Sequence, residues 1–491
     1  MADIIRIDAA LCRISARHSL LVPDLTLAEG EHWCLFGGNG AGKTLVSRLL
    51  RGDLTAGRRH VHYLDGFEPR RDICTVSFEE QQKLWTLENR RDISEYSDNA
   101  VDQGTTVSSL ILGERAATEA EGEEFLALVE ALALTDYLER GIRFLSSGQV
   151  RRAMIAMALF RKPRLLILDD PLESIDVGSC ARIAAVLQDW MSASDRSTLL
   201  LCRRPRDILQ GITHIACMEE LVLGTHGRRD EVVQSEQWHR IVSRKPRLPA
   251  ALPPPLPKYQ APPLPSGVAL IELRNINAGY QGRLVLRDFS WTMHQGQHTL
   301  IEGPNGSGKS TLLSLIDGEN HMAYGQEVYL FGRRRGSGES VWDIKARFGV
   351  VSNELHNRYV RGWRVLDVVV SGFFASVGLY DDSGASEVEA ARAWLRTLAV
   401  EHLATDYYQE LSFGQQRLVL LARAMVKHPA ILVLDEPCVG LDDYHRGMIL
   451  GVVDIIAATT GTQIVYVSHE RGEVPGCINQ RITLRAAERS L

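Results

Sequence analysis

The chain has 491 residues, of which 45% are hydrophobic and 24% charged, the ordinary composition of a globular protein. At roughly 150 residues per domain, this length predicts two large domains or about three smaller ones, and the composition excludes a disordered chain or a fibrous rod. The 55 basic and 61 acidic residues give a net charge of −6, which does not favour nucleic-acid binding through bulk charge.

The eight cysteines are scattered and form no CxxC pair, so we expect reduced, buried thiols rather than a zinc site. No window of about 18 uncharged apolar residues occurs, and the N-terminus lacks the layout of a signal peptide. The sequence therefore predicts a cytoplasmic protein that reaches a membrane only through a partner.

Near the N-terminus, an apolar run predicts a short strand over residues 33–36. Residues 37–44 follow it and match the P-loop pattern GxxxxGK[ST]. Such a loop turns a strand into a helix, and its backbone N–H groups together with the helix N-terminus cradle phosphates. We expect the nucleotide-binding residues here to be Gly37, Asn39, Gly40, Gly42, Lys43 and Thr44, with the Thr44 hydroxyl also contacting Mg²⁺.

Farther along the chain, Leu145-Ser146-Ser147-Gly148-Gln149 opens a helix predicted over residues 148–160. An unbroken apolar strand over 165–168 ends at Asp169, a carboxylate suited to hold metal-bound water, and Asp170 follows as a candidate base. With another apolar run at 198–201, the alternation predicts an α/β fold whose parallel sheet is buried on both faces.

A proline-rich segment lies between the two halves of the chain. Nine of the eighteen prolines fall between Pro246 and Pro265. Such a composition favours extended polyproline II conformation, so we interpret residues 246–266 as a semi-rigid linker. The alternative is a PxxP ligand for another module.

The second half repeats the motifs of the first. A second P-loop occupies residues 303–310, Leu411-Ser412-Phe413-Gly414-Gln415 matches the segment at 145–149, and Leu434-Asp435 matches Leu168-Asp169. All three pairs have the same offset along the chain, which we call the repeat register, and it is far too long for a solenoid repeat. We infer a duplicated domain, with one copy at 1–245 and the other at 267–491.

The candidate site residues of the second half follow from this register. For nucleotide binding they are Gly303, Asn305, Gly306, Gly308, Lys309, Ser310 and Thr311; for Mg²⁺ they are Ser310 and Asp435. Glu436 is the candidate general base for the attacking water. The segments containing Ser146, Gly148 and Gln149, and Ser412, Gly414 and Gln415, predict a second phosphate-contacting edge, although helix capping alone would explain a single instance.

These motifs together resemble the nucleotide-binding domain of the ATP-binding-cassette (ABC) family. In the second half, the Walker A loop, signature helix, Walker B strand and switch histidine (His469) follow in the family's order. The resemblance implies two tandem P-loop NTPase domains, each with a RecA-like α/β core and a helical subdomain, that bind and hydrolyse ATP with Mg²⁺. It also implies that Tyr280 stacks on adenine.

In this family two cassettes pack head to tail, and each ATP lies between one P-loop and the other cassette's signature. The resemblance therefore implies two composite sites. One joins residues 303–311, Asp435, Glu436 and His469 to Ser146 and Gly148; the other joins residues 37–44, Asp169 and Asp170 to Ser412 and Gly414.

The first half departs from the family pattern. Arg203 stands in register with His469, and Asp170 is one methylene shorter than Glu436. Residues 14–18 hold no aromatic ring. The loop glutamine that contacts Mg²⁺ in the family is absent from both halves, since Asn353 and Phe78 align with it, and Glu79, Glu80, Gln81 and Gln82 follow Phe78. This departure argues against Mg²⁺ contact through that loop. We expect an active second site and a first site that binds ATP and hydrolyses it slowly; the alternative is two equally competent sites.

The segment from Leu330 to Lys345, together with Ser371-Gly372-Phe373-Phe374, resembles the molybdenum-transport-associated branch of the family. That resemblance implies a partner, a molybdate permease at the cytoplasmic face of the inner membrane. Two alternatives remain open, a protein that remodels ribosomes or other nucleoprotein and a regulatory ATP-binding module. A short proline-rich linker and signatures that end in glutamine disfavour the ribosomal class.

Two further features have competing interpretations. The Arg333–Arg335 cluster is a solvated face, a phosphate or nucleic-acid contact, or a permease contact. Trp363 belongs either to a permease groove or to the core of the helical subdomain.

Overall fold

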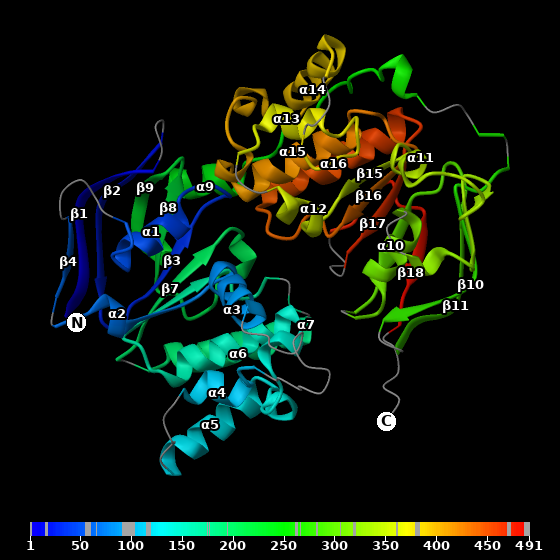
Figure 1. The fold of residues 1–491 in the computed structure, drawn as a ribbon. Helices are drawn as coiled ribbons and strands as arrows, with labels where there is room; N and C mark the ends of the chain where they lie inside the picture. The colour runs from blue at the N-terminus through cyan, green and yellow to red at the C-terminus, as the bar shows by residue number, and fades with distance from the viewer. Residues whose placement is uncertain are drawn as a thin grey trace. The chain divides into compact units, whose positions relative to one another are not determined.

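The structure is a computed structural model, and it describes residues 2–485 except 15–17, 55–59, 65, 91–103, 114–118, 174, 176, 194, 261–263, 266, 281–282, 305, 318–320, 360–361, 379–382 and 469–472. The chain divides into two compact units, Met1–Arg244 and Lys245–Leu491. Figure 1 shows helices and strands alternating within each unit. Each unit is therefore described by itself below.

The first unit is built on one mixed sheet with the strand order β4-β1-β2-β9-β8-β3-β7-β6-β5. Its strands are β1 (Asp3–Arg13), β2 (Ser19–Ala28), β3 (His32–Phe36), β4 (Val61–Tyr63), β5 (Ile73–Val76), β6 (Leu165–Asp169), β7 (Ser197–Cys202), β8 (His214–Glu219) and β9 (Val222–Arg228). Its helices are α1 (Lys43–Leu50), α2 (Pro69–Asp72), α3 (Phe78–Arg90), α4 (Val107–Leu112), α5 (Glu119–Ala131), α6 (Ser147–Phe160), α7 (Val177–Met191), α8 (Arg229–Val232) and α9 (Glu236–Val242).

The second unit has an antiparallel sheet, β11-β10-β13-β14, and a parallel sheet, β15-β16-β17-β12-β18. Its strands are β10 (Ile271–Tyr280), β11 (Arg283–Met293), β12 (Thr299–Glu302), β13 (Glu327–Leu330), β14 (Arg333–Arg334), β15 (Phe348–Val351), β16 (Ile431–Asp435), β17 (Gln463–Val467) and β18 (Gln480–Thr483). Its helices are α10 (Lys309–Asp317), α11 (Val341–Lys345), α12 (Asn353–Arg358), α13 (Val365–Val370), α14 (Ala385–Thr397), α15 (Phe413–Met425) and α16 (Asp443–Thr459).

The apolar strands are buried on both faces, as their unbroken hydrophobic runs predicted. Along β6, Leu165 and Ile167 enter one core cluster while Leu166 and Leu168 enter another. Along β16, Ile431 and Val433 alternate with Leu432 and Leu434 in the same way. This alternation follows from the two-residue period of a strand that has covering layers on both sides.

The helices of the helical subdomain pack together in the second unit. In the second unit, α13, α14 and α15 lie together, away from β10 and β11 (Figure 1). The largest core cluster there combines Trp394 of α14, Val369 of α13 and Leu421 of α15 with strand residues such as Leu432. The α/β architecture with helical subdomains that the sequence predicted is confirmed.

The duplication is also visible in the backbone. Four pairs of non-glycine residues with left-handed backbone angles stand in the repeat register: Ala9 and Asn275, Ala133 and Ala399, Lys162 and His428, and Asp170 and Glu436. Because such angles are uncommon outside glycine, their recurrence in register shows that both units follow the same chain path at these turns.

The proline-rich segment packs against the second unit over its described residues. Leu252, Leu256 and Tyr259 pack on the largest core cluster, and Leu248 lies so close to Gly451 of α16 that a Cβ there would come within 2.5 Å of it. The ring of Tyr259 lies 4.6 Å from that of Phe373, centroid to centroid. The extended spacer that composition predicted is therefore a docked segment over this stretch.

All eight cysteines are free, and five of them are buried: Cys12, Cys34, Cys202, Cys217 and Cys438. Burial raises the pKa of Cys217 and of Cys438 to about 12 in each case, so both thiols are protonated at neutral pH. The prediction of buried thiols holds for these five, whereas Cys74, Cys180 and Cys477 are half-buried.

Candidate functional site

In the first cassette, β3 leads into the P-loop and α1 leaves it. Gly42 caps α1 with a left-handed backbone (φ 104°), an angle that glycine adopts without strain. The buried Lys43 turns its amine back on the loop, donating to the carbonyl oxygens of Gly37 (2.7 Å) and Gly38 (2.9 Å). A cation held over a loop of inward backbone N–H groups is an arrangement suited to phosphate.

The second cassette repeats this arrangement between β12 and α10. Gly308 has φ 96°, and the Lys309 amine donates to the carbonyl oxygens of Gly303 (2.8 Å) and Pro304 (3.2 Å). Gly303 itself admits no side chain, since a Cβ would come within 2.6 Å of the carbonyl oxygen of Leu484. Asn305, predicted to contact nucleotide, lies outside the described residues, whereas Gly306 and Ser310 are exposed at the loop and Thr311 is buried.

The carboxylates predicted to serve Mg²⁺ lie at the ends of β6 and β16. Thr44 donates from Oγ1 to Oδ2 of Asp169 at 2.9 Å, which joins the two predicted metal ligands of the first cassette. Burial, and then the neighbouring Asp170, raise the pKa of Asp169 to about 7. Burial and Glu436 likewise raise the pKa of Asp435 to about 6. Each aspartate is thus a partly buried carboxylate beside a second carboxylate. Such a pair of oxygen ligands, with too little positive charge nearby to balance it, is suited to bind a hard divalent cation.

The residue after each Walker B aspartate has a left-handed backbone, with φ 45° at Asp170 and 47° at Glu436. For a residue with a side chain, this conformation is strained, and such strain is concentrated at functional sites. Two residues predicted to act in catalysis thus share one unusual turn. Their surroundings differ, however.

Arg203 pairs with the candidate base of the first cassette. Its Nε lies 2.9 Å from Oδ2 of Asp170, and its guanidinium also bonds the carboxylate of Glu173. The three side chains are only 12%, 13% and 21% exposed. Burial alone would lower the Arg203 pKa, but the two carboxylates raise it overall, so the arginine stays charged. In register with Glu173 and Arg203, the second cassette has Val439 and His469.

Each signature helix carries a buried arginine that holds an amide side chain of the helix that follows β5 or β15. Arg151 donates from Nε to Oε1 of the fully buried Gln81 at 3.0 Å, and Arg417, its counterpart in the repeat register, donates to Oδ1 of Asn353. Phe78, which aligns with Asn353 by its place after the strand, is 54% exposed instead. Gln81, and not Phe78, therefore accepts the arginine hydrogen bond in the first cassette that Asn353 accepts in the second.

The signature segments cap their own helices. Ser146 and Gln149 form a reciprocal capping box on α6, and Ser412 and Gln415 form one on α15. Helix capping, the alternative explanation for a single signature segment, thus accounts for the local contacts of both segments. The two glycines differ: a Cβ on Gly414 would meet the His445 ring at 2.4 Å, whereas a Cβ on Gly148 would meet nothing within 4 Å.

Some residues singled out in the sequence lie outside the described residues, and others differ in burial from the prediction. His469 and the side chain of Tyr280 lie outside the described residues. In the Arg333–Arg335 cluster, Arg333 and Arg334 are exposed, but Arg335 is buried. Its Nη1 lies 3.2 Å from Oε1 of Glu339. The solvated-face interpretation therefore holds for Arg333 and Arg334 but not for Arg335. Trp363 packs against the core of the helical subdomain, in agreement with its core interpretation.

Sequence reasoning missed Arg151, Arg417 and Glu173. A signal for the two arginines was present, because they stand in the same repeat register as the motifs. Glu173 gave no such signal, since Val439 replaces it in the second half.

Two P-loops, each with an acidic strand end and a capped helix, define a pair of nucleotide-binding domains. A family model described as ABC transporter matches residues 21–173 and 286–439. The chain belongs to the ATP-binding-cassette transporter family, as an ATP-binding protein with two cassettes that hydrolyses ATP.

Its relatives support that assignment along the whole chain. It is 34% identical to the ABC transporter ATP-binding protein ModF of Escherichia coli over 96% of this chain and 94% of that protein. It is 27% identical to an uncharacterized ABC transporter ATP-binding protein of Schizosaccharomyces pombe over 93% and 92%. An archaeal ribosome recycling factor, aABCE1, solved with ribosomal stalk protein aP1, shares the fold at a TM-score of 0.55 and 17% identity, over 97% of this chain and 87% of that one.

Proposed function

We propose that the second cassette performs most of the ATP hydrolysis and that the first binds ATP and hydrolyses it slowly. The observation that carries this proposal is the ion pair between Arg203 and Asp170 at 2.9 Å. A general base must be free to contact the attacking water, whereas the carboxylate of Asp170 is held by the half-buried guanidinium of Arg203. At these positions the second cassette has Glu436 and, in place of the arginine, His469.

In this proposal Lys43 and Lys309 hold the β- and γ-phosphates. Thr44 with Asp169, and Ser310 with Asp435, hold Mg²⁺, which neutralises phosphate charge when bound. Glu436 orients the attacking water and accepts its proton, and His469 contacts the terminal phosphate. The signature residues, including Ser146 and Ser412, are proposed as the second phosphate-contacting edge, with Tyr280 stacking on adenine.

The test compares conservative amide variants of the two candidate bases. We expect Glu436→Gln to lower steady-state ATP hydrolysis by about 10²–10⁴-fold, because it removes the general base. Asp170→Asn should change the rate less than about twofold, since that carboxylate already serves Arg203. Retained ATP binding in both variants, measured by equilibrium dialysis, is the control. Equal losses of rate would contradict the asymmetry.

We further propose that the protein energises an oxyanion permease, with molybdate as the transported ion. Similarity to ModF over nearly the full length supports this proposal. Among the described residues, each helix is too short or too polar to span a bilayer, so the proposal requires a separate membrane partner. The partner would be met at the cytoplasmic face of the inner membrane.

Capture of partners by the Glu436→Gln variant tests this link, because slow hydrolysis should prolong the ATP-bound state. Tagged protein with ATP is incubated with solubilised membranes and, in parallel, with ribosome fractions. Recovery of a molybdate permease, absent when ADP replaces ATP, is the expected result. Recovery of ribosomes without any permease would replace transport by a ribosomal role.

A further inference from the structure

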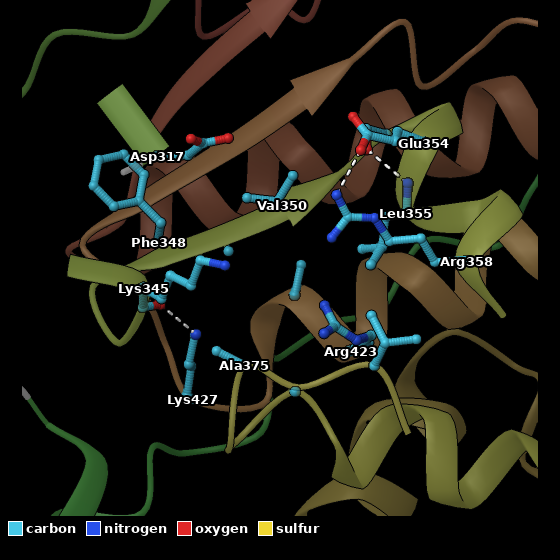
Figure 2. A pocket seen from close by; sticks show the side chains of 15 residues that line it. Asp317, Lys345, Phe348, Val350, Glu354, Leu355, Arg358, Ala375, Arg423 and Lys427 are labelled. Atoms are coloured by element: carbon cyan, nitrogen blue, oxygen red, sulfur yellow. Dashed lines mark hydrogen bonds and ion pairs between the residues drawn. The ribbon is translucent and has the colours of Figure 1, made fainter. Parts of the chain in front are cut away.

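A cavity of about 120 Å³ lies in the second cassette, away from its P-loop. It borders β15, α11, α12 and the C-terminal end of α15, and no described residue of the 303–311 segment lines it. In Figure 2, the nitrogen-bearing ends of Lys345, Arg358 and Arg423 face the same space, with Lys427 close to Lys345. The charged side chains on its wall are Asp317, Lys345, Glu354, Arg358, Arg423 and Lys427.

Two of these cations are almost fully buried, with Arg423 6% and Lys427 5% exposed. Lys427 donates from Nζ to the carbonyl oxygen of Lys345 at 2.7 Å. Arg423 donates to the Tyr359 hydroxyl at 2.6 Å and to the carbonyl oxygen of Ser376 at 2.7 Å. All these acceptors are neutral, and in the described part of the chain no carboxylate lies within ion-pair distance of either cation. Buried charges without opposite charges are costly.

The cost of burying this charge is expressed in the pKa of Lys427. Burial first, and then the positive charges of Arg423 and Lys345, lower the pKa of Lys427 to about 7. Of the remaining charged groups on the wall, Arg358 is paired with Glu354 at 2.5 Å across one turn of α12, and Asp317 lies at the end of α10. Among the described lining residues, four cations therefore stand against two carboxylates, an excess of positive charge that a bound anion would balance.

A competing explanation for Arg423 and Lys427 is that they stabilise the C-terminal end of α15. Cations near a helix C-terminus interact favourably with the helix dipole and with the last carbonyl groups. The first cassette argues against this explanation. Its equivalent helix α6 has Met157 in register with Arg423 and the exposed Arg161 in register with Lys427. That helix ends without a buried pair of cations, so termination does not require one.

We propose that this cavity binds a small tetrahedral oxyanion, held by Arg423, Lys427 and Lys345. Its volume exceeds the roughly 10–15 Å³ that one water needs. A guanidinium offers parallel N–H donors to two oxygens of such an anion, and the lysines supply point charges. The site is independent of the assignment of the hydrolysing cassette. The anion has two sources, phosphate released by ATP hydrolysis or an oxyanion such as molybdate from the medium.

Calorimetric titration of the full chain tests the site. Both P-loops are first saturated with a non-hydrolysable ATP analogue, because empty P-loops also bind oxyanions. Phosphate, sulfate and molybdate are then titrated at constant ionic strength in sodium chloride. We expect one anion per chain, with a dissociation constant raised at least tenfold by Lys427→Met and by the milder Lys345→Gln, and unchanged by the matched control Arg161→Met.

The absence of one-site binding, or equal affinity in wild type and both cavity variants, would overturn the proposal and leave the cations as helix caps. Tightest binding of phosphate would identify the reaction product as the source, and tightest binding of molybdate the external ion. The affinity for sulfate, which keeps its charge over this range, should also rise from pH 8 to pH 6.5 with proton uptake, because an anion favours charged Lys427. Affinity that does not change with pH would overturn the role of Lys427.

Discussion

Arg203 occupies the position that His469 holds in the second cassette, and it changes what the neighbouring carboxylate does. With Glu173 it forms a buried group of one cation and two carboxylates around the candidate base of the first cassette. Removing one partner of such a group leaves the others buried without compensation. The arginine that we propose to weaken catalysis thus also contributes to the stability of the first cassette.

This arrangement predicts a strong effect of Arg203→Ala on stability. The variant should lower the free energy of unfolding of the first cassette by about 2–3 kcal/mol, because Asp170 and Glu173 lose their counter-charge. The double variant Glu173→Val with Arg203→His, which carries the residues of the second cassette, should lose less. Urea unfolding midpoints measure both. Equal midpoints for wild type and Arg203→Ala would show that the ion pairs contribute nothing.

At the scale of elements, one carboxylate adds polar contacts to the apolar packing that docks the proline-rich segment on the second cassette. Glu387 of α14 is 3% exposed, accepts from the Tyr259 hydroxyl at 2.9 Å and pairs with Lys258. Burial alone would raise its pKa, but hydrogen bonds from Lys258, Ser386 and Tyr259 lower it to about 2. The segment is thereby part of the folded unit that follows it.

The lowered pKa of Glu387 predicts a pH-dependent contribution. Stability from this carboxylate is fully present above its unfolded pKa of about 4.3 and is lost as pH falls toward about 2. Glu387→Gln should therefore cost about 1–3 kcal/mol at pH 7 and progressively less below pH 4. Urea midpoints at several pH values, with Glu389→Gln on the exposed face of α14 as control, measure this. A cost independent of pH would contradict the prediction.

At the scale of the whole molecule, the two cassettes follow the same chain path at the shared turns but differ in their candidate site residues. Shared left-handed turns at Asp170 and Glu436 show that the geometry was kept in both copies. The differences at Arg203 and Asp170 fall on positions that we propose to act in hydrolysis, and the P-loop motif itself is present in both copies. Binding without rapid turnover is the expected consequence for the first copy.

Single-turnover kinetics test this difference in the full chain. Wild type should bind two ATP molecules per chain and hydrolyse them in two phases, because the two sites hold different bases. Lys309→Ala should abolish the fast phase and Lys43→Ala the slow one, each with the loss of one bound nucleotide. Quench-flow with labelled ATP and equilibrium dialysis provide the measurements. A single phase in wild type would contradict two unequal sites.

Much of the molecule was predictable from sequence because its signals are local. The P-loops, the capped helices beginning at Ser147 and Phe413, and the strands ending at Asp169 and Asp435 follow from patterns within short windows. The constant offset between matching motifs then indicated the duplication and the missing switch histidine of the first copy.

Other features depended on residues far apart in the chain. The bonds from Arg151 to Gln81 and from Arg203 to Asp170, the docking of Tyr259 on Glu387, and the cations around the cavity join segments that are distant in sequence. Whether a charged side chain is solvated, paired or buried without a counter-charge depends on what packs over it. Local patterns therefore determined which nucleotide-binding motifs the chain carries, and only tertiary packing decided which charges meet, because burial and pairing are properties of the folded surroundings.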